Sequence, residues 1–143
     1  MAFVEQVLSE MTVEEKVGQT IMADLDFIKP EDLRRYPIGG ILNGGNTSPN
    51  GNQQASTDEW KSLAQDFYEE SIKTGSNIPI LWGTDAVHGH SNVLVATIFP
   101  HNIGLGASAN EQLLEAIGAA VAEEVLATGL YWTFAPTVTV PQD

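Results

Sequence analysis

The residues best suited to chemistry are an aspartate and three histidines that stand close together, between Asp85 and His101. Asp85 comes three residues after Trp82, the end of the apolar run IPILW (78–82). A carboxylate in that position can accept hydrogen bonds from the hydroxyl groups of a sugar. It can equally cap a turn by accepting hydrogen bonds from the amides of its own loop. The residue types alone leave both interpretations open.

The histidines His88, His90 and His101 raise two further alternatives, a metal site and a nucleophilic triad. His88 and His90 would share one face of an extended backbone, but Gly89 between them argues against a regular strand. No third ligand follows at a fixed spacing, so the pattern of a metal site is incomplete. Ser91 lies near them in the sequence, but the G-x-S-x-G pattern of a nucleophile elbow is absent. We therefore expect no metal ion and interpret the histidines as partners of buried backbone groups in a long loop.

The glycines and tryptophans of the chain have simpler interpretations. The glycine pairs at 39–40 and 44–45 match neither G-x-G-x-x-G nor the P-loop pattern, and they are typical of tight turns. Trp82 and Trp132 could stack against a sugar ring, although an aromatic residue on an apolar strand more often packs in the core. We expect no cofactor.

Short apolar runs and amphipathic segments must position these side chains. Strands are expected over 38–42, 78–82 and 130–140, the last of them broken at Pro136. Apolar residues at helical spacing predict helices over 3–11, from Thr12 onwards, over 57–74 and over 110–128. The inward-facing residues of the two longer helices are expected to be Trp60, Leu63, Ala64, Phe67 and Ile72, and then Leu113, Leu114, Ile117, Val121 and Val125. We expect irregular structure over 23–37, 43–56 and 83–109.

The alternation of strands and helices predicts parallel strands joined by helical crossovers, and therefore an α/β fold. In such folds, functional side chains lie just past the carboxyl ends of the strands. The stretches NGGN (43–46) and GTDAVHGH (83–90) occupy that position, as does the polar tail after APTVTV (135–140).

Composition limits the number of domains and the kinds of partner that the protein can bind. The 143 residues are enough for about one domain, and a hydrophobic content of 43% supports a packed core. A formal net charge of −13 disfavours nucleic acids and anionic membranes as partners. Cysteine is absent, no apolar run approaches the roughly 20 residues of a membrane helix, and no signal peptide is expected at the start.

Five stretches of the chain resemble glycoside hydrolase family 3, the family of β-glucosidases and exo-β-glucanases. They are MTVEEKVGQ (11–19), IGGILNGGN (38–46), IPILWGTDAVHGH (78–90), ATIFPHNIGLGA (96–107) and ATGLYWTFAPTV (127–138). They follow the order and spacing of the family and span nearly the whole chain. The resemblance implies that residues 1–143 are the N-terminal portion of a (β/α)8 TIM-type barrel, with about three strands and their flanking helices.

The resemblance also implies a site and a reaction. Asp85 would contact hydroxyls of the non-reducing glucosyl residue of a β-glucoside or β-glucan oligosaccharide, and Gly44 would lie at the mouth of the same pocket. Family enzymes hydrolyse terminal β-D-glucosyl residues with retention, using two carboxylates. Both belong to later regions of the family's chains, so no catalytic residue is expected here and the 143 residues alone are expected to be inactive.

An alternative is a non-catalytic fragment that binds sugar, or that acts only after assembly or complementation. Three strands would leave an open parallel sheet edge, which self-association or the rest of the barrel would cover. Family members are often secreted or periplasmic, but the sequence itself leaves the location of this protein unknown.

Overall fold

A parallel sheet forms the centre of the computed structural model, which describes residues 2–137. Its strands are β1 (Met22–Asp24), β2 (Gly40–Asn43), β3 (Leu81–Thr84) and β4 (Trp132–Thr133), in the order β1-β2-β3-β4. All three neighbouring pairs are parallel. The sequence therefore predicted the fold class correctly but gave about three strands where the described residues form four.

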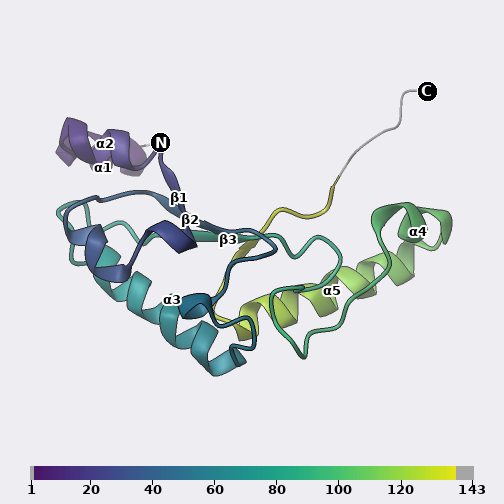
Figure 1. Ribbon diagram of the computed structural model, residues 1–143. Helices are drawn as coiled ribbons and strands as arrows, with labels where there is room; N and C mark the ends of the chain where they lie inside the picture. Colours follow the sequence, from purple (N-terminus) through teal and green to yellow (C-terminus); the bar gives the residue numbers. More distant parts are fainter. Residues whose placement is uncertain (1, 138–143) are drawn as a thin grey trace.

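Within residues 2–137, five α-helices accompany the sheet. They are α1 (Ala2–Glu10), α2 (Val13–Gly18), α3 (Thr57–Ser71), α4 (Asn102–Ala107) and α5 (Glu111–Ala127). Short 3-10 turns lie at η1 (Leu25–Phe27), η2 (Pro30–Arg34) and η3 (Pro49–Gly51). The long helices α3 and α5 lie on one side of the sheet, whereas α1 and α2 stand at its amino-terminal end (Figure 1). No helix within 2–137 is long and apolar enough to cross a lipid bilayer.

Strand register separates the two faces of the sheet. Ala23, Ile41 and Trp82 form one cross-strand row, and Asn43 and Thr84 continue the same face. This face meets the helices, because the Trp82 ring lies 5.4 Å from the ring of Phe67 and 6.1 Å from that of Trp60, both on α3.

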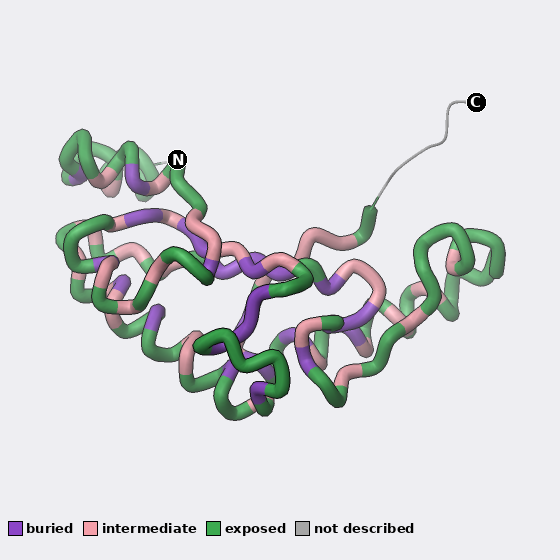
Figure 2. The backbone as a smooth tube through the Cα atoms, viewed as in Figure 1, coloured by how far each residue is buried: buried purple, intermediate pink, exposed green. Residues whose placement is uncertain are grey.

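The core lies between that face and the helices. Ile41, Trp60, Phe67 and Leu130 are fully or almost fully buried, and Val121 and Val125 contribute from α5 (Figure 2). The predicted inward faces of both helices are thus confirmed in their central turns. Leu113, in the first turn of α5, is exposed instead, because that end of the helix extends past the sheet.

Two segments predicted to be irregular contain a short strand or a short α-helix. β1 overlaps the start of the stretch assigned to 23–37, and its three residues are too few to show an alternating pattern. α4 falls within the predicted loop 83–109, where the glycines of NIGLGA hide the helical spacing. The predicted third strand begins at 130, but only Trp132–Thr133 pair with β3 and residues 138–140 lie outside the described part.

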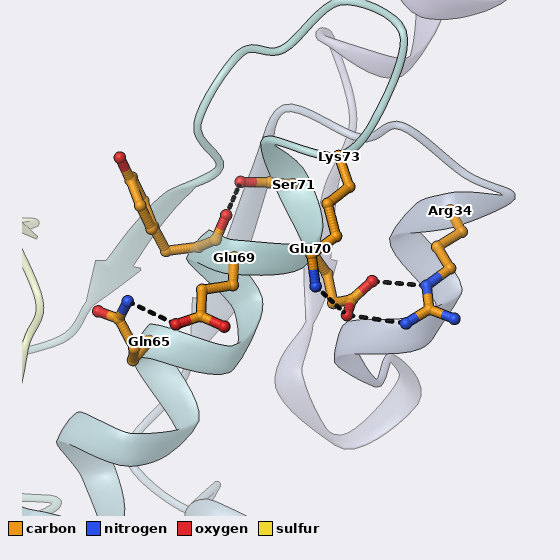
Figure 3. A network of polar contacts seen from close by, with 7 residues as sticks. Arg34, Gln65, Glu69, Glu70, Ser71 and Lys73 are labelled. Carbon is orange, nitrogen blue, oxygen red and sulfur yellow. Dashed lines mark hydrogen bonds and ion pairs between the residues drawn. The ribbon is translucent and has the colours of Figure 1, made fainter.

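An ion-pair cluster holds η2 against α3. Arg34 donates two hydrogen bonds to Glu70, from Nε to Oε2 (2.6 Å) and from Nη2 to Oε1 (2.8 Å), and Lys73 Nζ lies 2.9 Å from Oε1 (Figure 3). These bonds, those of Arg34 above all, lower the pKa of Glu70 to about 2. The cluster ties the connection between β1 and β2 to the end of α3.

Candidate functional site

Gly44 and Asp85 leave the sheet side by side. Asn43 and Thr84 are paired in the β2–β3 register, and Gly44 and Asp85 are the next residues of the two strands. Both therefore lie at the carboxyl edge of the parallel sheet, where such folds place their ligand-binding groups. The structure brings together the two site residues that the sequence indicates.

The Asp85 carboxylate is available to a ligand. Its side chain is exposed and makes no hydrogen bond or ion pair with any other residue between 2 and 137. It therefore caps no turn in this part of the chain, and the sequence alternative of a turn-capping aspartate is wrong. Gly44 is half-buried, and a Cβ built there would meet only Asn46 Oδ1, at 3.5 Å.

Alternation along β3 places Asp85 on the sheet face opposite the helices. Gly83 lies in one row with Leu42 and Trp132, and Asp85 follows two residues later on the same side. A Cβ at Gly83 would lie 2.8 Å from the rings of both Trp132 and Phe134. Glycine is therefore needed at 83, because the two aromatic side chains occupy the space beside it.

A buried polar chain fixes the ends of the strands beneath the site. Trp82 Nε1 donates to Asn43 Oδ1 (2.7 Å), and Asn43 Nδ2 donates to Thr84 Oγ1 (2.9 Å). Asn43 and Thr84 are fully buried. Because a buried amide that lost its partners would be costly, this chain locks β2 and β3 in one register. Trp82 is consequently a core residue and does not stack on a sugar.

Asn92 connects the loops that follow β2 and β3. Its Nδ2 donates to the backbone oxygens of Gly44 (2.6 Å) and Thr47 (3.0 Å). Sequence reasoning missed Asn92 and the Asn43–Thr84 pair, since nothing in the pattern of the chain joins residues more than forty positions apart. The one local signal was that Asn92 lies two residues after the candidate stretch GTDAVHGH (83–90).

The three histidines make contacts within the loop after β3 and in the core. His88 Nδ1 lies 2.8 Å from the Phe99 oxygen, and its ring lies 4.2 Å from that of His101. His90 is fully buried beside Trp60, with Nε2 3.1 Å from Thr128 Oγ1. No group of three or more potential metal ligands occurs among the described residues. His88 thus pairs with a half-buried backbone oxygen, whereas His90 pairs with a side-chain hydroxyl, so the expected pairing with a buried backbone group is wrong for His90.

Comparison with known proteins identifies the family. A model described as the glycosyl hydrolase family 3 N terminal domain matches residues 12–143. The chain belongs to this family. The four parallel strands that the structure describes and their flanking helices are thus the N-terminal part of the family's (β/α)8 domain.

Relatives of this family 3 chain are much longer proteins. It is 29% identical over 153 residues to the lysosomal beta glucosidase of Dictyostelium discoideum, covering 95% of this chain and 18% of that protein. It is 30% identical over 147 residues to the periplasmic beta-glucosidase of Salmonella typhimurium, covering 99% of this chain and 17% of that protein. Less than a fifth of each relative is therefore matched.

A solved structure is similar over the same stretch. The exo-1,3/1,4-beta-glucanase ExoP of a Pseudoalteromonas species is 48% identical to this chain, with a TM-score of 0.92. The match covers 99% of this chain and 18% of the ExoP chain. Sequence and backbone geometry thus agree across the whole described region.

Proposed function

We propose that the protein containing this chain hydrolyses terminal, non-reducing β-D-glucosyl residues of β-glucosides or β-glucan oligosaccharides. Residues 1–143 would form part of its N-terminal barrel domain and one wall of its sugar pocket. In this proposal, Asp85 accepts hydrogen bonds from glucosyl hydroxyls, and the Gly44 backbone lets the sugar approach the mouth of the pocket closely.

One observation carries the proposal beyond the similarity to β-glucosidases and ExoP. Asp85 holds an exposed carboxylate without a protein partner, among the described residues, at the carboxyl edge of a parallel sheet. A carboxylate that is hydrogen-bonded to hydroxyl groups recognises a sugar without needing a cofactor. The neighbouring polar chain under β2 and β3 gives it a rigid base.

We propose in addition that these 143 residues alone do not catalyse hydrolysis. Retaining hydrolysis needs a nucleophile and an acid/base roughly 5 Å apart on either side of the scissile bond. Asp85 is one carboxylate, and its proposed partners are hydroxyl groups away from the bond that breaks. The two catalytic carboxylates would come from other parts of the protein.

The test is Asp85→Asn in the intact protein, assayed with 4-nitrophenyl β-D-glucoside. We expect a fall in kcat/KM of about a hundredfold, because hydrogen bonds to sugar hydroxyls strengthen in the transition state. Asp66→Asn is the matched control, since Asp66 is an exposed aspartate on α3, on the other side of the sheet. Unchanged kcat/KM for Asp85→Asn would refute the site, and an equal loss for Asp66→Asn would show a general effect of removing charge.

The uncovered sheet face supports a second candidate, a fragment that binds sugar or acts only by complementation. Met22 and Leu81 lie on that face and are 39% and 48% exposed. Co-expression with the remaining part of the barrel would distinguish the two candidates. Activity restored by a separate second chain would favour complementation, whereas activity of only the continuous protein would favour the first proposal.

A further inference from the structure

The hydroxyl of Thr133 bridges the two residues on either side of Asp85. Thr133 Oγ1 donates to the Thr84 oxygen (3.1 Å) and accepts from the Ala86 amide (3.1 Å). A threonine hydroxyl has one hydrogen to donate, so the two bonds together fix both the donor and the acceptor role. The backbone on both sides of the candidate sugar ligand is thereby held by one side chain.

The bridge lies where the β3–β4 ladder ends. The last paired residues are Thr84 and Thr133, and the Phe134 amide still donates to the Thr84 oxygen (3.1 Å). In a continuing parallel ladder, the Ala86 amide would bond a backbone carbonyl of β4. Instead it bonds the Thr133 hydroxyl, and Asp85 becomes the residue at which β3 departs from the sheet.

We infer that Thr133 is a positioning residue for Asp85, an inference that rests on the proposed function. The side chain of Asp85 has no hydrogen bond of its own among the described residues. Its backbone sets the position of its Cα atom and the direction of its Cα–Cβ bond, and the Thr133 hydroxyl holds that backbone before and after it. Thr133 itself touches no sugar in this scheme and acts only through Asp85.

Removal of the hydroxyl tests the inference in the intact protein. Thr133→Val keeps the shape of the side chain, and we expect it to lower kcat/KM for 4-nitrophenyl β-D-glucoside about tenfold, because a small displacement of a binding group is costly. Thr133→Ser keeps the hydroxyl and should remain within about twofold of the unmodified protein. Thr97→Val is the control, since Thr97 is exposed and its hydroxyl bonds no described residue.

A double-mutant cycle separates positioning from a merely structural role. In an Asp85→Asn background, Thr133→Val should lower kcat/KM by less than about twofold, because the carboxylate that Thr133 positions has already been removed. The same loss in both backgrounds would overturn the inference. Thr133→Ala against Thr133→Ser provides a second comparison if the valine variant does not fold. If neither the valine nor the alanine variant folds, the hydroxyl serves the fold and the inference is also overturned.

These experiments distinguish a failure of the proposed function from a failure of the inference about Thr133. If Asp85→Asn leaves kcat/KM unchanged, the proposed function of the site fails, and the role of Thr133 fails with it. If Asp85→Asn is impaired but Thr133→Val is not, only the inference about Thr133 fails. A loss for Thr133→Val that Thr133→Ser rescues, and that disappears without Asp85, would support both.

Discussion

The tautomer of His90 follows from its surroundings. The Thr128 hydroxyl donates to the Val125 oxygen (2.6 Å), so it can only accept from His90 Nε2, which must carry the hydrogen. Nδ1 is buried without a partner among the described residues. Protonation would place a second N–H there with nothing to receive it. Burial accordingly lowers the pKa of His90 below 6.5, although the nearby charge of Glu124 acts in the opposite direction.

A loss of stability in mild acid follows from that pKa. The unfolded chain takes up a proton on His90 near pH 6.5, whereas the folded chain does so only at lower pH, so stability falls as the pH drops below about 6.5. His90→Gln keeps a donor to Thr128 but cannot titrate. We expect its thermal inactivation to depend less on pH between about 7.5 and 5.5 than that of the unmodified protein. His101→Gln, which removes an exposed histidine, serves as control, and an identical pH dependence for His90→Gln would contradict this account.

At this scale, residue type and local position indicated Asp85, whereas Gly44 came only from the resemblance to the family, and neither source indicated the residues that hold them. Asp85 is recognisable because it follows an apolar strand, which is a local signal. Thr133 and Asn92 act on residues far away in the sequence, and a threonine or an asparagine has many local roles. Their partners become known only when the strand register is known.

Among the elements, α3 begins with a capping box, as α2 does. The Glu59 amide donates to Ser56 Oγ (3.3 Å), and the Ser56 amide donates to Glu59 Oε2 (2.7 Å), which completes a capping box. Hydrogen bonds from the Ser56 amide and hydroxyl also lower the pKa of Glu59. α3 carries Trp60 and Phe67 into the core, so its start controls how the helix meets β3.

Loss of the cap should lower the stability of this element. We expect Ser56→Ala to reduce the free energy of unfolding by about 1 kcal/mol, the usual contribution of a serine cap. Ser62→Ala is the control, because Ser62 is exposed within α3 and alanine favours a helix interior. Urea unfolding of the intact protein measures both. Equal effects of the two substitutions would mean that the capping box does not stabilise α3.

Helices were easier to predict than strands for a physical reason. α3 and α5 are long enough to show several turns of apolar spacing, and Ser56 and Asn110 cap their first turns. β1 and β4 have three and two residues, and hydrogen bonds to neighbouring strands define them rather than any pattern of their own. β1 was therefore missed, and the predicted third strand was too long.

For the whole molecule, the two sheet faces have different surroundings. One packs on α3 and α5, whereas the other carries Met22, Leu81 and Gly83 and has no helix over it in the described chain. The edges β1 and β4 each have one strand neighbour only, within residues 2–137. Open edges and uncovered apolar residues favour association with further strands. The similarity to a (β/α)8 domain agrees with this asymmetry, because barrel strands face a shared interior.

The open face should make residues 1–143 associate when they are produced alone. We expect light scattering to give a mass above the 15.4 kDa of one chain, and we expect the chain to bind a hydrophobic dye. Leu81→Ser should reduce both, because Leu81 lies on the open face and is 48% exposed. Leu94→Ser removes a leucine that is 72% exposed but lies outside the sheet, and should change neither. A monodisperse monomer with a cooperative thermal transition would contradict this prediction, since the chain would then be stable without anything to cover its sheet.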